Sequence, residues 1–157
     1  MLKISFLELF LRVVPESFLI VFLIYIMSGE EFYRSKYIIS SCLFSISIYL
    51  IRFLPIHFGI HFILNTMVLI LLCILINRLS IQKSIGCGLI SMTTLALCEL
   101  GNLFFLKNFL KINIEISMNS PLKRVEYFMP SLILLLFIVL VVYKLVNKSL
   151  RGKDKCI

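Results

Sequence analysis

The chain has 157 residues, of which 61% are hydrophobic and 15% charged, and its mean hydropathy of +1.05 is far above that of an ordinary soluble domain. This composition predicts an integral membrane protein built as one polytopic domain, with no room for a separate catalytic or nucleic-acid-binding domain. The formal net charge of +8 comes from basic residues at predicted helix ends and in the C-terminal tail, which is typical of membrane topology signals and not of a nucleic-acid surface.

The apolar residues form five runs along the chain. A hydrocarbon core about 30 Å thick needs about 20 helical residues, and each run approaches that length. We therefore predict an all-α bundle of about five transmembrane helices. The predicted spans are residues 6–27, 37–54, 58–76, 84–106 and 128–146, and residues 147–157 form a basic tail.

The first predicted span carries three charged residues, Glu8, Arg12 and Glu16. Residues four apart share one side of a helix, so Arg12 can pair with both carboxylates. Such a triad is expected to face protein or water and not lipid. Pro15 cannot donate a backbone hydrogen bond, so we predict a kink beside Arg12. The acidic residues and the lack of a small-residue cleavage site argue against a signal peptide.

The second and third spans are predicted to form a tight antiparallel hairpin around Pro55, which ends the second span. Within the second span, Ser41, Ser45, Ile48 and Arg52 recur at helical spacing, which predicts that Arg52 points into the bundle.

His57, His61 and Asn65 lie one turn apart at the start of the third span. The same spacing occurs in metal sites, but HFGIH has no intervening Glu, so interfacial histidines with ordinary hydrogen bonds are favoured over a metal site. A role in pH sensing is chemically open, because histidine titrates near neutrality.

The fourth span contains a stripe of mostly small residues, which helices use to pack closely. The stripe consists of Ser84, Gly88, Ser91, Leu95, Glu99 and Asn102. Glu99 is therefore predicted to point inward, with Arg52 as its preferred partner and Glu16 as the rival acceptor for Arg52. The fifth span, almost without polar side chains, is predicted to be a lipid-facing anchor.

Residues 107–127 form the largest predicted loop, and residues 111–117 alternate polar and apolar side chains. The alternation suits a short strand or an interfacial segment, although a solvated connector is favoured. The five cysteines show no metal-ligand spacing, and the four that lie in predicted spans, Cys42, Cys73, Cys87 and Cys98, are interpreted as small apolar fillers.

The basic tail predicts a cytoplasmic C-terminus. Five spans then place the N-terminus outside the cell and the connections at 28–36 and 77–83 inside. The charged residues of the first, second and fourth spans converge on the outer half of the membrane in this topology. They form either a pocket for a small ligand or peptide terminus, or a self-satisfied network that orients the helices.

The segments LELFLRVVPESFLIVFLIYIMSG, RSKYIISS, YLIRFLPIHFGIH and LALCELGN resemble the multi-spanning sensor region of agr-type and related histidine kinases of low-GC Gram-positive bacteria. The similarity lies in hydropathy, helix number and an inside C-terminus. Because the chain ends just after Lys155, we expect no phosphoacceptor helix and no ATP-binding domain. The resemblance implies a sensor without its transmitter, such as a free-standing receptor, accessory or immunity-like protein.

Three function classes follow. The first is a sensor-like or accessory protein that binds an extracellular signal and acts through a partner membrane protein, such as a histidine kinase. The second is a substrate-binding membrane component of a transporter, which would work with an ATPase. The third, an intramembrane enzyme, is disfavoured because the spans contain no Ser/His, Asp/Asp or HExxH arrangement. We predict no catalytic residue, metal or cofactor.

Overall fold

The computed structural model describes residues 9–30, 32–53, 58–109 and 121–153. Near several helix ends it describes the backbone alone, and the side chain of Arg52 is among those left out. The predictions that concern Glu8, His57 and the 111–117 segment lie outside the described residues.

Every element in the described ranges is helical. They are, in chain order, η1 (Leu9–Val13), α2 (Val14–Ser28), α3 (Arg34–Phe53), α4 (Phe58–Leu75), α5 (Ile81–Phe109) and α7 (Pro121–Lys153). The all-α prediction is confirmed for this part of the chain, where helices occupy the described portion of every predicted span.

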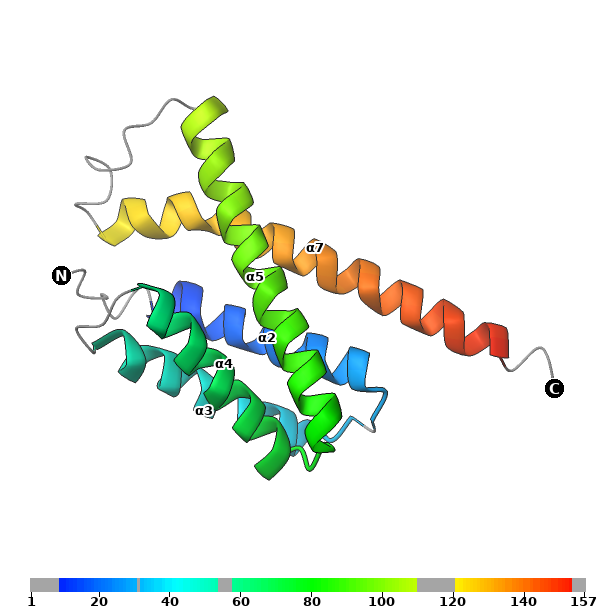
Figure 1. Cartoon of the computed structure of the whole chain (residues 1–157). Coiled ribbons are helices and arrows are strands. Elements are labelled where there is room, and N and C mark those ends of the chain that lie inside the picture. The colour runs from blue at the N-terminus through cyan, green and yellow to red at the C-terminus, as the bar shows by residue number, and fades with distance from the viewer. Residues whose placement is uncertain (1–8, 31, 54–57, 110–120, 154–157) are drawn as a thin grey trace.

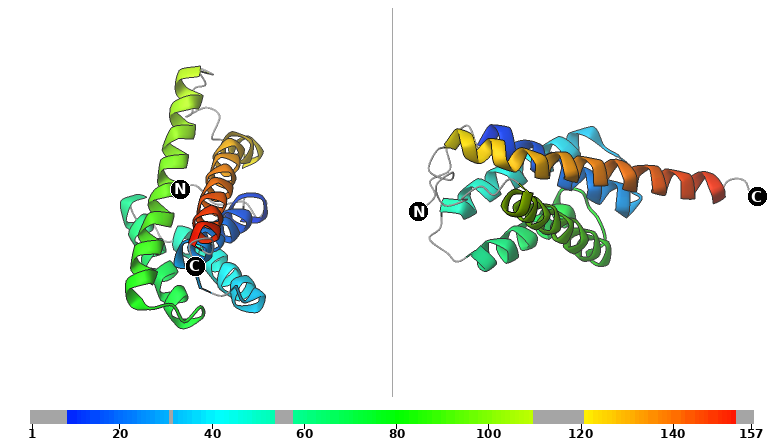
Figure 2. Two further views of the ribbon diagram at one scale, coloured as in Figure 1. Left: turned by 90° about the vertical axis from the view of Figure 1, so that its right-hand side faces the viewer. Right: turned by 90° about the horizontal axis from the view of Figure 1, so that it is seen from above.

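The helix α2 lies at the centre of the bundle, in direct contact with α3, α5 and α7 (Figures 1 and 2). Its Ile20 and Ile24 side chains are completely buried, together with Phe44 of α3, Leu69 of α4 and Leu135 of α7. Large apolar side chains from four helices therefore meet in one core, which removes their surface from the surroundings and holds the helices together.

The two longest helices, α5 and α7, leave the bundle in different directions. Figure 1 shows α5 crossing α2 and α7 steeply, while α7 continues past the end of α2. One face of α7, with Ser131, Leu135 and Val139, is buried, whereas Ile133 and Phe137 are about two-thirds exposed (67% and 66%). The predicted lipid-facing anchor thus has one packed stripe and a broad apolar surface.

Three described helical segments are long and apolar enough to cross a membrane: Phe10–Ser28, Ile81–Leu106 and Met129–Lys148. Gly59–Leu75 is a shorter apolar helix. The connections at 28–36 and around residues 76–80 lie at the same end of the bundle as the C-terminal end of α7 (Figure 1).

The predicted inward faces of two helices are buried. On α3, Ser41, Ser45 and Ile48 are at most 4% exposed. On α5, Ser84 and Ser91 are completely buried, and a Cβ atom added at Gly88 would lie 2.9 Å from Cγ1 of Ile70 on α4. The small residues of α5 thus allow α4 to approach closely.

A π-helical turn precedes Pro15, the residue beside which the sequence predicts a kink. Residues Leu9–Val13 have π-helical hydrogen bonding, and the regular helix α2 begins at Val14 with Pro15 in its first positions. Proline is tolerated there because the first residues of an α-helix have no intrahelical acceptor for their N–H groups. Arg12 therefore lies in a widened turn, a feature that is frequent at functional sites.

Candidate functional site

Arg12 lies between two carboxylates that come from different helices. Its Nη2 donates to Oε1 of Glu99 on α5 at 2.5 Å, and its Nε lies 3.9 Å from Oε2 of Glu16 on α2. The planar guanidinium suits this role because it presents several N–H donors in fixed directions. The three side chains, hereafter the Arg12 triad, tie α2 to α5.

The local sequence explains how the triad forms. Glu16 follows Arg12 by four residues and lies in the first turn of α2, so the two side chains share one side of the helix. Glu99 continues the small-residue stripe of α5, whose buried face packs against the rest of the bundle. Because α2 contacts α5 directly, Glu99 on this stripe lies next to the π-helical turn that contains Arg12.

The triad is shielded from the surroundings. The side chains of Arg12, Glu16 and Glu99 are 15%, 6% and 22% exposed, respectively. When all three are ionised they carry one positive and two negative charges. Charges in a poorly polar environment are costly unless they are paired and hydrogen-bonded, so the triad has a strong electrostatic preference for staying assembled.

Three other residues of the predicted polar set lie close to the triad in sequence or on a neighbouring helix. Asn102 lies one helical turn beyond Glu99 and is 4% exposed. On α4, Asn65 and His61 share one side of the helix, and the Oδ1 of Asn65 and Nδ1 of His61 are buried without a hydrogen-bond partner among the described residues. These two atoms give α4 an unsatisfied polar face.

The expected pair between Arg52 and Glu99 stays a prediction, because the Arg52 side chain is not described. In the structure, Glu99 accepts a hydrogen bond from Arg12, which the sequence predicted to pair with Glu8 and Glu16. The sequence did contain one indication of this pair. Arg12 and Glu99 both lie in the half of their helices that is far from the basic loops, so the two residues were expected at a similar depth in the membrane. A carboxylate can accept from more than one donor, so Arg12 and Arg52 need not exclude each other at Glu99.

Metal binding finds no support in the described part of the chain. No group of three or more His, Cys, Asp or Glu side chains there could hold a metal ion. His57, one of the two histidines of HFGIH, lies outside that part. Cys73, Cys87 and Cys98 form no disulfide and are buried, as expected for apolar fillers, whereas Cys42 is exposed.

A second polar and aromatic cluster, not foreseen from the sequence, occupies the opposite end of the bundle. The hydroxyl of Tyr25 donates to Oδ1 of Asn77 at 2.7 Å, and the hydroxyl of Tyr37 donates to the carbonyl of Phe18 at 3.1 Å. The rings of Tyr25, Phe32 and Tyr37 pack against one another with centroids 5.2–6.2 Å apart. These contacts fix the connection between α2 and α3.

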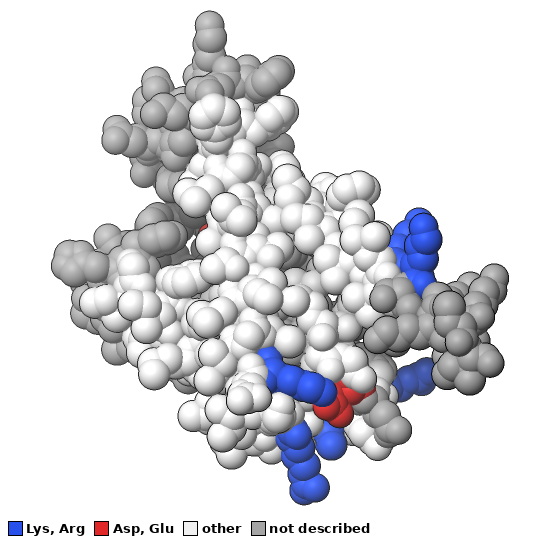
Figure 3. Space-filling model, turned by 45° about the vertical axis from the view of Figure 1, so that its right-hand side comes forward, with Lys and Arg blue, Asp and Glu red and all other residues white. Residues whose placement is uncertain are grey.

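Basic side chains gather at one end of the molecule (Figure 3). Figure 3 shows them in blue at one end of the molecule, beside a small acidic patch, whereas most of the rest of the visible face is uncharged. An exposed ion pair joins Lys83 Nζ and Glu30 Oε1 at 2.7 Å. The exposed or half-buried basic residues of this end are Arg34, Lys36, Arg78, Lys83, Lys144 and Lys148.

The chain matches no protein-family model, no curated protein and no solved structure. Interpretation of the site therefore depends on the geometry just described.

Proposed function

We propose that this chain is a multi-pass protein of the cell membrane, with five spanning helices, the N-terminus outside and the C-terminus in the cytoplasm. Three helices with the length and apolarity of a membrane span support this. The gathering of exposed Lys and Arg at the end that carries the 28–36 connection and the end of α7 supports the orientation, because such residues are enriched on the cytoplasmic side.

Within that membrane, we propose that the protein is a sensor-like or accessory protein that binds an extracellular signal and acts through a partner membrane protein, such as a histidine kinase. The observation that carries this is the Arg12 triad, a charged unit buried between α2 and α5 in the half of the bundle assigned to the outer leaflet. Intramembrane charges are costly and by default indicate function. A small molecule or peptide terminus with a carboxylate would compete for Arg12, and one with an amine would compete for the two glutamates.

The contacts of α2 suggest how binding would reach a partner. The helix α2 packs against α3, α5 and α7. If a ligand replaced Glu16 or Glu99 as the partner of Arg12 and α2 moved in response, the packing of all three neighbouring helices would change. The broad apolar surface of α7 is available to a partner helix as well as to lipid. In this proposal the protein carries no catalytic residue and no cofactor.

A transporter component that binds substrate is the second candidate. It is favoured by the buried Oδ1 of Asn65 and Nδ1 of His61 on α4, which have no hydrogen-bond partner in the described part of the chain and would suit a polar substrate or water. Purification of the protein from native membranes distinguishes the two candidates. A histidine kinase recovered with it supports sensing, and an ATPase recovered with it supports transport.

The role of the triad is tested with two conservative variants. Arg12→Lys keeps the charge but loses the planar fork, and Glu16→Gln keeps the shape but loses the charge. Under the proposal both variants unfold in detergent close to the wild-type temperature but lose the partner or the signal-dependent output. Arg34→Lys, an exposed arginine of α3, is the matched control. If stability and output fall together in the two variants, the triad is part of the scaffold.

A further inference from the structure

The ionised Arg12 triad carries more negative than positive charge. It combines the single guanidinium of Arg12 with the carboxylates of Glu16 and Glu99, so one negative charge is in excess. Glu8 and Arg52, whose side chains are not described, are one acid and one base and together add no net charge. The excess of one negative charge therefore holds for the triad alone and for the triad taken with both of these residues.

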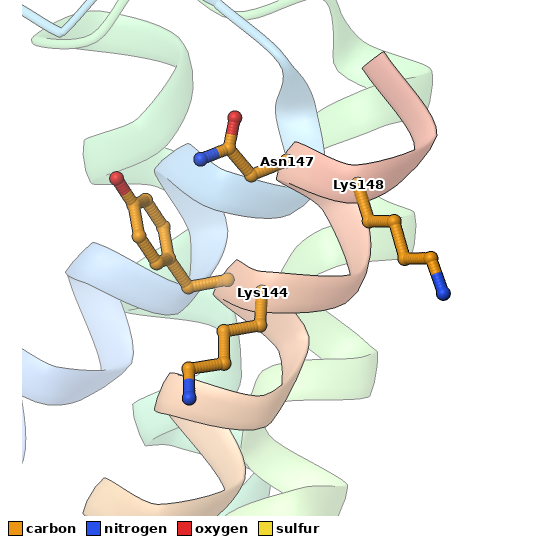
Figure 4. A pocket seen from close by; sticks show the side chains of 4 residues that line it. Lys144, Asn147 and Lys148 are labelled. Carbon is orange, nitrogen blue, oxygen red and sulfur yellow. The ribbon is translucent and has the colours of Figure 1, made fainter. Parts of the chain in front are cut away.

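The other charged side chains that the structure describes lie at the opposite end of the bundle. They are found in or beside the connections at 28–36 and 76–80 and on the last turns of α7 (Figures 1 and 4). They are Glu30, Arg34, Lys36, Arg78, Lys83, Lys144 and Lys148. None of these cations belongs to the part of the bundle that holds the triad.

The geometry of the triad leaves its two acids in different situations. Nη2 of Arg12 lies 2.5 Å from Oε1 of Glu99, whereas its Nε lies 3.9 Å from Oε2 of Glu16, which is beyond the length of an N–H···O hydrogen bond. Glu16 is also the more buried acid, with a side chain 6% exposed against 22% for Glu99. A second cation beside these carboxylates would offset a charge that is costly to bury, and the more exposed Glu99 is the acid that it can reach first.

The charge of the triad discriminates between two classes of ligand. A ligand carboxylate beside Arg12 gains one attraction but meets two repulsions, from Glu16 and Glu99. A ligand ammonium group beside the two acids gains two attractions and meets one repulsion. Each carboxylate offers about four lone-pair sites, so it can accept from an ammonium N–H in addition to a guanidinium. Such charge-assisted hydrogen bonds are among the stronger ones in proteins.

We infer that the Arg12 triad binds its ligand through a primary ammonium group, such as the amino terminus of a peptide, and disfavours ligands that offer a carboxylate. The ammonium group donates to carboxylate oxygens of Glu99 and Glu16, while Arg12 stays beside them. This inference rests on the function proposed above, because it names the chemical class of the signal that the triad recognises.

The test compares three leucine derivatives of similar size on the purified full chain in a neutral detergent at pH 7. Leucinamide carries an ammonium group, N-acetylleucine carries a carboxylate, and N-acetylleucinamide carries no charge. An α-amino group has a pKa of about 7.7–8.0, so leucinamide is mostly protonated under these conditions. Saturation-transfer NMR gives the dissociation constants. Leucinamide should bind roughly tenfold to a hundredfold more tightly than the other two probes, the value of one charge-assisted hydrogen bond.

Glu99→Gln removes one negative charge with little change of shape and leaves Arg12 and Glu16 as a neutral pair. It should weaken the binding of leucinamide by roughly tenfold or more. The matched control is Glu30→Gln, which makes the same change in the exposed pair with Lys83 and should alter the dissociation constant less than about twofold. Equal weakening in both variants would assign the binding to the overall charge of the protein and overturn the site.

The comparison of the three probes on the wild-type chain does not require any variant to fold. Tighter binding of N-acetylleucine than of leucinamide would overturn the cationic class but keep the triad as a ligand site. Equal binding of the three probes, or binding of none, would also overturn the inference, because the charge of the ligand would then play no part. The proposed function fails on a separate result, which is the joint loss of stability and output in Arg12→Lys and Glu16→Gln.

Discussion

The two ends of the helix bundle each hold an ion pair of similar length in different surroundings. Arg12 and Glu99 meet at 2.5 Å with side chains 15% and 22% exposed, whereas Lys83 and Glu30 meet at 2.7 Å with side chains 49% and 47% exposed. In water, exposed pairs contribute little, because solvent screens the attraction and both long side chains lose freedom. The difference between these pairs therefore lies in burial and not in distance.

For a buried ion pair, removing one partner and removing both partners have different effects on stability. Removing both charges can be nearly neutral, but removing one leaves the other without compensation. At the Arg12 triad two carboxylates lie beside one guanidinium, so the loss of Arg12 is expected to be more damaging than the loss of either carboxylate. At the opposite end the basic side chains are exposed or half-buried, so water solvates their charges.

The largest expected effect is that of Arg12→Ala. It leaves Glu16 and Glu99 buried without their shared cation and should destabilise the fold by about 3–5 kcal/mol, with a smaller value where the unfolded state in the membrane finds other partners. Unfolding in mixed detergent micelles with increasing dodecyl sulfate measures this. A loss of unfolding free energy below about 1 kcal/mol would mean that the Arg12 triad contributes no more to stability than an exposed ion pair.

Between the two ends, Gly88→Ala tests the close approach of α5 to α4. The added Cβ would lie 2.9 Å from Cγ1 of Ile70, and overpacking of this kind costs about 1–3 kcal/mol. The control is Gly86→Ala, whose Cβ meets no atom within 4 Å and which should be neutral or slightly stabilising. Adding Ile70→Ala should recover part of the loss at Gly88, and strict additivity would contradict the contact.

A smaller effect is expected for Tyr25→Phe at the second cluster. The change removes the hydrogen bond to Asn77, which is buried but uncharged, and should cost about 1 kcal/mol. A double-mutant cycle with Asn77→Ala measures the coupling in the same unfolding assay. The absence of coupling would show that the cluster is held by ring packing alone.

The smallest effect is predicted for Lys83→Gln. Because both partners are about half exposed, the loss of the pair with Glu30 should change the stability by no more than about 0.5 kcal/mol. The difference from wild type should disappear as salt is added, because exposed charges are screened. A change as large as that for Arg12→Ala would mean that exposure does not separate the two pairs.

The sequence predicted the helices and their buried faces well for physical reasons. Long apolar runs need helices in a membrane, and small residues at helical spacing mark close packing, as the buried Ser84 and Ser91 confirm. The ends were less accurate for α7. Its polar flanks are good helix formers, so the helix extends from Pro121 to Lys153, beyond the predicted 128–146.

The partner of Glu99 could not be derived with the same certainty. Periodicity shows which face of a helix is buried but not which helix lies opposite, and α5 contacts α2, α4 and α7. The second cluster was missed for a related reason: Tyr25 and Asn77 are 52 residues apart and meet only because α2 and α4 end at the same level. Tertiary neighbours of this kind leave no local pattern.

The central claim is that the charges of α2 and α5 form one unit inside the bundle. A double-mutant cycle with the near-isosteric changes Arg12→Gln and Glu99→Gln, read as unfolding free energy in detergent, tests it most directly. The account predicts that the double variant is more stable than the sum of the single losses implies, with a coupling energy of about 0.5–3 kcal/mol. Losses that simply add would contradict it, because they would mean that Arg12 and Glu99 do not act on each other.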